Sequence, residues 1–489
     1  MAVGLWDNLA RQTDQLGGTE LRRSLRLVTL GASLAAAFFG MTGGTALPEM
    51  ADLLGAEPKH FGWLGAIPFA AAAVQLPVSW IVEHTRRRKW LFITCVGLHR
   101  ALYLIIAALP FLLPAAQEWR GVRLSCLLAT FFMSATLACV SNPTWWGWMA
   151  DMIPSKIRGR YWAHRRRMYI VVSIPSAIFA GWFIDYATGL FPQNPDFGRG
   201  IGLAVVIALG AIAGVADILL FMFIPEIPKP PREHPLTVRN LVATPLRDVD
   251  FRRYVLFSAL ITFATAAMMG PFVQRNAREV VQMTNWQTNL AMIVAPQIGA
   301  FLAVGWWGRA RDRWGNRPVL VLGTIMVIPL AAAWVLATPN LWWIGPLITM
   351  CGGAAWVGIE IGSTNILMDF AGGGKMSSYQ AVNSIVAGIG GFCGPFLAAW
   401  VVHSLADWRW QIGPIVLINY HVLFILSSLL RIFCVPLARR IHEPQARRTS
   451  EVLRFLVADI YSGTRSAVFL PARVCSWPLR LFNGNGNGH

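Results

Sequence analysis

Charged residues are scarce in this chain. They make up 13% of its 489 residues, whereas hydrophobic residues make up 55%, and the mean hydropathy is +0.50. A water-soluble domain normally carries about 25% charged residues. The composition therefore excludes an ordinary soluble protein and predicts that most of the chain lies in a lipid bilayer.

Paired cysteines and catalytic arrangements are lacking as well. The seven cysteines fall mostly inside apolar runs, and none forms a Cys-x-x-Cys pair or a Cys/His cluster with metal-ligand spacing. We interpret them as small hydrophobic residues. The glycine-rich stretch before Lys375 resembles a phosphate loop but lacks the Ser or Thr directly after the lysine. We expect no metal, no cofactor and no enzymatic activity.

Twelve apolar runs are long enough to cross a membrane, which takes about 20 residues in a helix. They lie at residues 26–47, 61–82, 90–113, 124–148, 167–189, 200–224, 253–273, 287–307, 317–338, 342–368, 379–402 and 413–438. We therefore predict an all-α membrane protein with twelve transmembrane helices.

The positive charges are distributed unevenly between the loops. The net charge is +18, and only seven of the 42 Lys and Arg residues fall in the predicted outer segments if both chain ends are cytoplasmic: Lys59, Arg120, Arg123, Arg199, Arg275, Arg278 and Arg409. The positive-inside rule then predicts an N-in, C-in, multi-pass protein of the inner (plasma) membrane. We expect the basic surface to meet anionic lipid headgroups rather than nucleic acid.

Two acidic positions recur at about half the chain length. Glu83 and Asp312 each precede a basic cluster between two apolar runs, 229 residues apart (312 − 83), and Asp151 and Asp369 lie 218 residues apart (369 − 151). Such a period indicates that one membrane unit has been duplicated. Two related halves could rock about a shared site and open it to alternate sides.

The domain boundaries follow from this repeat and from local composition. We predict a cytoplasmic N-terminal segment at 1–24, six-helix bundles at 25–225 and 253–440, a proline-rich cytoplasmic linker at 226–252, and an amphipathic cytoplasmic tail at 441–489. We expect a monomer.

The second charged loop carries a recognisable motif, and on it the chain resembles the major facilitator superfamily, bacterial members in particular. The family pattern Gly-x-x-x-Asp-Arg-x-Gly-Arg-Arg is matched at Gly308, Asp312, Arg313, Gly315 and Arg317. The first loop departs from the pattern, because Glu83 replaces the aspartate and only the basic run that includes Arg87 is kept. The resemblance covers nearly the whole chain and implies two six-helix bundles.

In that family these loops help to lock the cytoplasmic side. The resemblance therefore implies a cytoplasmic gate formed by Glu83, Arg87, Asp151, Arg158, Asp312, Arg313 and Arg317. Opposite charges that pair in one state and separate in the other bias a two-state equilibrium. The alternative is that these residues are positive-inside topology signals.

Few ionisable residues lie at membrane depth, where each one is a site hypothesis. Glu360 is in the tenth run, which lines the cavity in the family, and a carboxylate there could carry protons. The alternative is a structural acid that is buried against the backbone or paired to a base. Arg100, in the third run, could bind an anionic substrate or form a structural ion pair.

The remaining candidates for substrate contact are uncharged. They lie in runs that the resemblance places around the cavity: Asn142, Trp145, Gln274, Trp356 and Asn365. Taken together, the sequence predicts a secondary transporter that moves a small organic solute by alternating access, either coupled to protons or driven by the solute gradient. A non-transporting membrane protein on the same fold, acting in assembly, pigment or lipid handling, or sensing, is the alternative.

Overall fold

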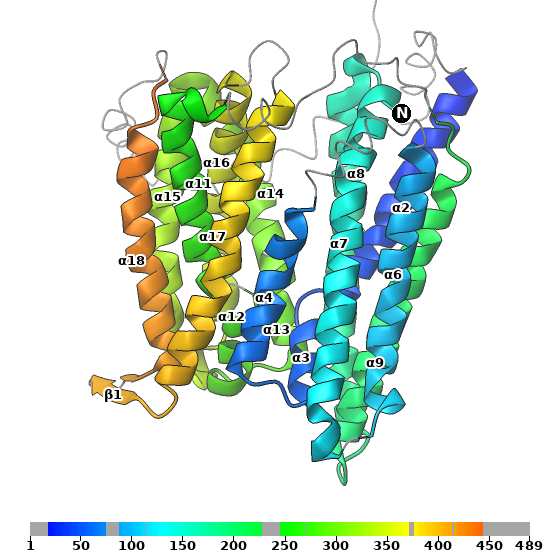
Figure 1. Ribbon diagram of the computed structural model, residues 1–489, viewed down its shortest axis with the longest axis vertical. Coiled ribbons are helices and arrows are strands. Elements are labelled where there is room, and N and C mark those ends of the chain that lie inside the picture. Colours follow the sequence, from blue (N-terminus) through cyan, green and yellow to red (C-terminus); the bar gives the residue numbers. More distant parts are fainter. Residues whose placement is uncertain are drawn as a thin grey trace, which may run out of the picture.

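The computed structural model describes residues 18–74, 88–114, 116–226, 245–268, 270–370, 376–412 and 415–443. These residues form two helical bundles that lie side by side (Figure 1). Nearly all of the predicted linker and tail, 227–244 and 444–489, lies outside the described residues.

The N-terminal half contains seven α-helices and one short 3₁₀ helix in its described part: α2 (Gly18–Thr42), α3 (Ala46–Leu53), α4 (Pro58–Ala72), α6 (Arg88–Leu112), η2 (Gln117–Trp119), α7 (Arg120–Met152), α8 (Ser155–Gly189) and α9 (Pro195–Phe221). The described part of the C-terminal half contains α11 (Val249–Met268), α12 (Pro271–Arg275), η3 (Asn276–Val280), α13 (Asn285–Asn289), η4 (Leu290–Val294), α14 (Ala295–Trp314), α15 (Asn316–Ala333), η5 (Trp334–Leu336), η6 (Pro339–Leu341), α16 (Ile344–Phe370), α17 (Met376–Ser404), β1 (Arg409–Ile412), β2 (Ile415–Ile418) and α18 (Asn419–Arg439).

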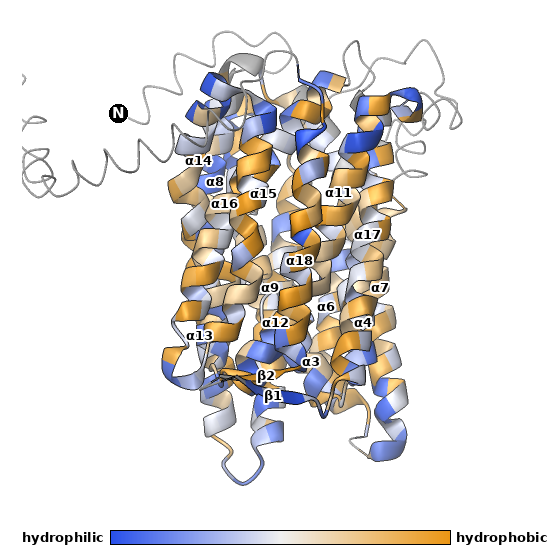
Figure 2. Cartoon of the chain, turned by 90° about the vertical axis from the view of Figure 1, so that its left-hand side faces the viewer, coloured by the Kyte–Doolittle hydropathy of each residue, from blue (hydrophilic) through white to orange (hydrophobic). Residues whose placement is uncertain are grey.

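The apolar runs form helices because a lipid-exposed backbone must satisfy its own hydrogen bonds. In the described part, 11 helical segments are long and apolar enough to cross a membrane. The remaining predicted run, 61–82, is represented by α4, whose 15 residues end at Ala72, and its continuation past Val74 lies outside the described residues. Hydrophobic residues cover the middle of the bundle and polar residues gather at its two ends (Figure 2).

Several predicted boundaries were wrong. Helix α2 begins at Gly18 rather than at residue 26 and includes the polar residues before Leu25, and α8 begins at Ser155 rather than at residue 167. The last span begins at Asn419 rather than at residue 413. The residues before it pair as the antiparallel hairpin β1–β2, with Arg409 opposite Ile418, and their apolar side chains had been read as part of the helix.

The two ends of the bundle differ in charge. At one end, here called the basic end, lie the starts of α2, α6, α8, α11 and α15 and the ends of α14 and α18, with these basic residues: Arg22, Arg23, Arg26, Lys89, Arg160, Arg166, Arg167, Arg252, Arg253, Arg309, Arg313, Arg317, Arg439 and Arg440. The opposite end, here called the hairpin end, holds β1–β2 with α3 and α12 (Figure 1). Under the predicted orientation, the basic end is cytoplasmic.

The two halves repeat each other in their helix caps. Glu226, after α9, accepts a hydrogen bond from the backbone N–H of Lys89 at the start of α6 (3.1 Å). Glu443, after α18, accepts hydrogen bonds from the N–H groups of Asn316 (2.9 Å) and Arg317 (2.6 Å) at the start of α15. A carboxylate is favoured there because the first N–H groups of a helix lack partners and carry partial positive charge. The same contact in both halves supports the predicted duplication.

The repeat also includes a break in the first helix of each half. Gly44 (φ 55°) separates α2 from α3, and Gly270 (φ 77°) separates α11 from α12, 226 residues apart (270 − 44). Residues other than glycine rarely adopt such positive φ angles. Each half therefore presents a short helix at the hairpin end.

Glycines allow close packing of the helices within the C-terminal half. A Cβ atom on Gly353 of α16 would overlap the backbone of Pro296 in α14, whereas a Cβ on its neighbour Gly352 would meet only Leu330 at 3.9 Å. The α14–α16 contact therefore requires glycine at position 353 but not at position 352.

We expect Gly353→Ala to lower the thermal unfolding midpoint of the purified protein. Inserting a methyl group into a packed contact costs about 1–3 kcal/mol. Gly352→Ala is the matched control and should leave the midpoint unchanged or raise it slightly, because alanine favours helix. Equal midpoints for the two variants would contradict the packing described.

Candidate functional site

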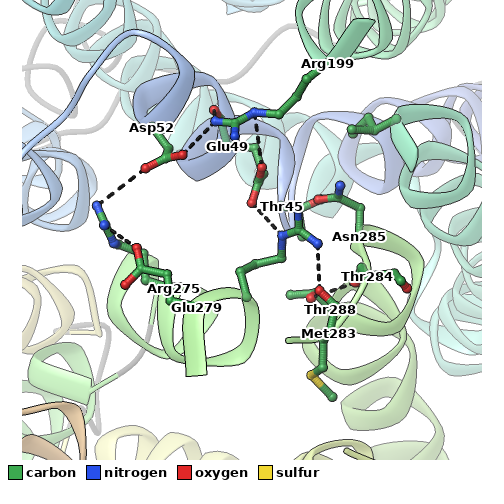
Figure 3. Close-up of polar contacts among 12 residues, drawn as sticks. Thr45, Glu49, Asp52, Arg199, Arg275, Glu279, Met283, Thr284, Asn285 and Thr288 are labelled. Carbon is green, nitrogen blue, oxygen red and sulfur yellow. Dashed lines mark hydrogen bonds and ion pairs between the residues drawn. The ribbon is translucent and has the colours of Figure 1, made fainter. Parts of the chain in front are cut away.

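Six charged side chains meet at the hairpin end and join the two halves (Figure 3). We call this cluster the acid–base seam, and it consists of Glu49 and Asp52 from α3, Arg199 from α9, Arg275 from α12, and Arg278 and Glu279 from η3. Three bases and three acids make the seam formally neutral.

Two ion pairs of the seam cross between the halves. Arg278 Nε donates to Glu49 Oε1 at 2.9 Å, and Arg275 Nη1 lies 3.8 Å from Asp52 Oδ1. The Glu49 side chain is 10% exposed and the Arg278 side chain 28%. Because this pair is largely withdrawn from water, loss of one partner leaves the other charge poorly compensated.

Other pairs of the seam lie within one half. Arg199 donates to Asp52 Oδ2 at 2.7 Å and lies 3.5 Å from Glu49 Oε2, while Arg275 pairs with Glu279. Tyr420 of α18 also donates its hydroxyl to Glu279 (2.8 Å). The seam encloses a cavity of about 290 Å³, lined also by Thr45 and Gln274.

The pairing across the seam follows the internal repeat. The offset of 226 residues that relates Gly44 to Gly270 also relates Glu49 to Arg275 (275 − 49) and Asp52 to Arg278 (278 − 52). The two crossing pairs, Glu49–Arg278 and Asp52–Arg275, therefore exchange under the relation between the halves. The short helix of one half is acidic and that of the other is basic.

Hydrogen bonds without opposite-charge pairs continue the junction from the seam toward the middle of the bundle. Asp185 of α8 accepts from the N–H groups of Asn285 and Trp286 (both 3.1 Å) and so caps α13 of the other half. Further along, Asn289 bonds Thr45 N (3.0 Å) and Ala177 O (2.9 Å).

The contact nearest the basic end in this series is a hydrogen bond from Gln297 Nε2 to Ser173 Oγ (2.9 Å). On the other flank, α4 packs against α17, where Gly62 and Gly65 approach Ala399 and Pro395. In the part of the chain that the structure describes, the polar pairs that join the halves are thus gathered from the middle of the bundle to the hairpin end.

Another ion pair at the hairpin end, outside the seam, joins the start of α4 to the start of α7 within the N-terminal half. Arg120 lies 3.0 Å from Glu57 Oε1 and donates to Gly55 O at 2.7 Å. The hydrogen bond from Lys59 and its positive charge lower the pKa of the Glu57 carboxyl. Glu57 therefore stays ionised at neutral pH.

The predicted cytoplasmic gate is only partly within the described chain. Glu83 and Arg87 lie outside the described residues, and so do the side chains of Asp151 and Arg158. Asp312 is 72% exposed and pairs with Arg311 of its own helix at 3.1 Å.

The other two gate residues are at the same end of the C-terminal half. The guanidinium of Arg313 lies over the ring of Trp314 at 6.0 Å, and Arg317 begins α15 under the cap from Glu443. The gate role of all seven residues stays a prediction.

Glu360 lies on an exposed face of α16, together with Trp356, which is 38% exposed, and Thr364. The neighbouring faces are covered, because Gly358 packs against Trp307 of α14 and Gly362 against Leu320 of α15. Within the described chain, Glu360 has no ion-pair partner. The structure therefore does not favour the alternative of a buried or paired structural acid.

Arg100 is buried in the N-terminal half and is not open to solvent, as the side chain of a substrate site would be. It is 5% exposed and stacks on Phe38 of α2, 3.8 Å from the ring centroid, with Asp217 of α9 at 3.9 Å. Glycines at 31 and 214 leave the space that this pair fills. The geometry fits the alternative of a structural ion pair, because the side chain is enclosed among three helices, and the substrate role stays a prediction.

The uncharged candidates are dispersed. Asn365 accepts a hydrogen bond from Arg311 (3.2 Å) and donates one to Ile361 O (2.7 Å), so it belongs to the network at the basic end. Trp145 packs against Trp162 of α8 at 5.6 Å, Gln274 lines the seam cavity, and the side chain of Asn142 lies outside the described part.

The seam was not predicted from the sequence. Arg199, Arg275 and Arg278 were identified as bases in outer segments, but Glu49 and Asp52 were not among the predicted site residues. The half-length spacing of Glu49 and Arg275 was the available signal.

The comparisons with known proteins agree with this architecture. The model of the Major Facilitator Superfamily matches residues 28–395, well over half of the chain. No curated protein sequence matches the chain significantly.

The solved structures that are similar in fold include three transporters. A variant of the nucleoside transporter NupG has a TM-score of 0.62 at 14% identity, with 86% of this chain and 100% of that chain covered. A bacterial homologue of the human lysosomal transporter Spinster, inward-facing and unoccupied, has a TM-score of 0.59 at 15% identity, with 86% and 95% covered.

The third is the fucose:proton symporter FucP of E. coli, with a TM-score of 0.54 at 15% identity and with 87% of this chain and 100% of that chain covered. At such identities the likeness shows the fold alone. The match over residues 28–395 goes further: the chain belongs to the Major Facilitator Superfamily.

Proposed function

We propose that the two halves of this secondary transporter alternate about a central site, and that the structure represents the state closed at the hairpin end. One observation carries the proposal: within the described residues, the polar pairs that join the halves are gathered toward the hairpin end, with the acid–base seam outermost. With the basic end cytoplasmic, as the positive-inside rule predicts, this is an inward-facing state. The similar Spinster homologue was solved in a state described as inward-facing.

The seam is arranged so that it can open. When the halves separate, Asp52 keeps Arg199 and Arg275 keeps Glu279, because each of these pairs lies within one half. Only the crossing contacts, Glu49–Arg278 and Asp52–Arg275, are lost. The energetic difference between the two states is therefore limited, as a two-state equilibrium requires.

The transported molecule is proposed to be a small organic solute, bound between the halves. Glu360 is proposed as the coupling residue, because it is an exposed carboxylate without an ion-pair partner in the described chain and lies at membrane depth on α16. The transporter is proposed to act as a monomer whose basic end contacts anionic lipid headgroups.

We expect neutralisation of the seam acids to open the hairpin end. In the double variant Glu49→Gln, Asp52→Asn, both crossing pairs are lost. The hydrogen-bonded pair Glu49–Arg278 is worth about 1.5–3 kcal/mol, and Asp52–Arg275 adds less because its atoms lie 3.8 Å apart and Asp52 is 40% exposed. Thr45, which is 1% exposed and lines the seam cavity, is changed to cysteine in a background that lacks the native cysteines. A membrane-impermeant maleimide added outside should label it roughly tenfold faster or more in the double variant.

The matched control is Asp250→Asn, which removes an ion pair with Arg253 within one helix and should leave the labelling rate unchanged. The exchange Glu49→Arg with Arg278→Glu, made in the Thr45→Cys protein with Asp52 intact, reverses one crossing pair. It should label as slowly as the parent Thr45→Cys protein. Unchanged labelling in the double variant would mean that the seam does not close the protein.

We expect Glu360→Gln to abolish the dependence of uptake on an imposed pH gradient. Glutamine has nearly the same shape but takes up no proton. Uptake is measured in proteoliposomes with a solute found by screening small organic compounds for thermal stabilisation of the protein. Glu118→Gln, at an exposed position of η2, is the control, and retained gradient dependence in Glu360→Gln would remove proton coupling through this residue.

A further inference from the structure

The cavity that the acid–base seam encloses is lined mainly by polar side chains. Its volume of about 290 Å³ lies at the lower end of the range of about 300–1,000 Å³ for small-molecule pockets. Within the described residues, only Pro48 and Met283 among its lining residues are apolar. The cavity is therefore suited to a small polar molecule rather than to an apolar one.

Two lining residues of the N-terminal half have buried atoms that lack hydrogen-bond partners in the described chain. Thr45 is 1% exposed, and its hydroxyl oxygen is one of these atoms. The other is Arg199 Nε, which lies 3.5 Å from Glu49 Oε2 in an ion pair but makes no hydrogen bond. Buried polar groups of this kind destabilise a fold unless water or a ligand satisfies them.

The C-terminal half contributes donors and an acceptor of the same kind. Arg275 Nε and Nη1 are buried without hydrogen bonds in the part that the structure describes, since Nη1 lies 3.8 Å from Asp52, which is too far for a hydrogen bond. The Arg275 guanidinium is held over the ring of Phe61, 4.3 Å from its centroid. Gln274 Oε1 is a buried acceptor that likewise lacks a partner there.

The charges of the seam restrict the kind of molecule that fits. Three bases and three acids cancel, so a ligand with a net charge would leave that charge uncompensated in a cavity that is partly withdrawn from water. The free N–H groups of Arg199 and Arg275, on different sides of the enclosed space (Figure 3), bind a carboxylate best. The free carbonyl oxygen of Gln274 requires a donor. A molecule with both a carboxylate and an ammonium group meets all three conditions.

We infer that the seam cavity is a binding site for a small zwitterion of the amino-acid class. Its carboxylate accepts hydrogen bonds from Arg199 and Arg275, and its ammonium group donates to Gln274. The site is separate from the proposed central site for the transported solute. The inference rests on the proposed function in one respect, because the cavity is complete only while the hairpin end is closed. Since the ligand contacts both halves, residues of both halves contribute to its affinity.

The test is titration calorimetry on the purified full-length protein in detergent at neutral pH. The zwitterionic probes are L-alanine, L-glutamine and γ-aminobutyrate. N-acetyl-L-alanine keeps only the negative charge of L-alanine, L-alaninamide keeps only the positive charge, and glycerol is a neutral polyol. We expect at least one zwitterion to bind, and the singly charged analogues and glycerol to bind at least about tenfold more weakly than it does.

Two variants locate the binding in the cavity without removing any ion pair of the seam. Thr45→Val, in the N-terminal half, and Gln274→Met, in the C-terminal half, should each weaken binding of the zwitterion about tenfold. Thr45→Val should not lower the thermal unfolding midpoint of the unliganded protein, because the hydroxyl that it removes has no partner in the described chain. The matched control is Gln117→Met, at an exposed position of η2 at the same end of the bundle, which should leave binding unchanged.

Binding of a zwitterion that is weakened in both variants supports the inference. Four results overturn it: a singly charged analogue that binds as tightly as L-alanine, binding of glycerol alone, binding that either variant leaves unchanged, and no binding of any probe, which would leave water as the occupant of the cavity. None of these results bears on closure of the hairpin end, which the maleimide labelling measures through the crossing ion pairs. The alternating-access proposal would therefore stand or fall separately.

Discussion

The ion pairs that cross the acid–base seam are the contacts on which the closed hairpin end depends. A duplicated protein faces a particular difficulty at such a place, because the relation between its halves brings equivalent positions together. Equivalent short helices with the same charge would repel each other. Here the position equivalent to Glu49 is Arg275 and the position equivalent to Asp52 is Arg278, so each repeat meets a copy of itself with opposite charge. Because the two repeats carry opposite charges at these positions, the short helices form two crossing ion pairs instead of repelling each other.

Closure at this end also needs contacts that can be released. The seam divides its charges so that each half is partly satisfied on its own, through Arg199–Asp52 in one half and Arg275–Glu279 in the other. A seam made only of crossing pairs would leave several uncompensated charges when it opened, and near an apolar interior that would hold the protein in one state. The inner contacts, in which Asn289 and the Asp185 carboxylate bond backbone groups, align the halves through hydrogen bonds rather than through pairs of opposite charges.

The sequence predicted the broad architecture well and the site only in part. Long apolar runs, the positions of the bases and the repeat of Glu83 and Asp312 were sufficient for two bundles of membrane helices, because these features depend on the bilayer and on local chain chemistry. The contacts of Arg100 could not be predicted in this way, since its pairing with Asp217 depends on which helices are neighbours. The small residues Gly31 and Gly214, which make room for that pair, acquire meaning only when α2, α6 and α9 are seen together. The sequence does not single out Glu49 and Asp52, because an acid at the end of a membrane span is explained equally well by its proximity to water until its partner in the other half is known.

Rocking of two halves requires each half to be stiffer than the junction between them, and a buried arginine serves this purpose in both. In the N-terminal half, Arg100 joins α6 to α9 through Asp217. In the C-terminal half, Arg431 of α18, 5% exposed, donates to Val327 O of α15 at 2.8 Å, and Ser428 donates to Ile328 O at 2.6 Å. These contacts join corresponding helices, α6 with α9 in one half and α15 with α18 in the other. They lie in apolar surroundings, where breaking them would leave a charge or a carbonyl group without a partner. The crossing pair Arg275–Asp52, by contrast, includes a carboxylate that is 40% exposed, so water can replace the partner when the halves part. The Arg275–Asp52 pair is therefore easier to separate than the enclosed ties within each half, whereas Glu49–Arg278, with a carboxylate that is 10% exposed, is the crossing pair that resists opening.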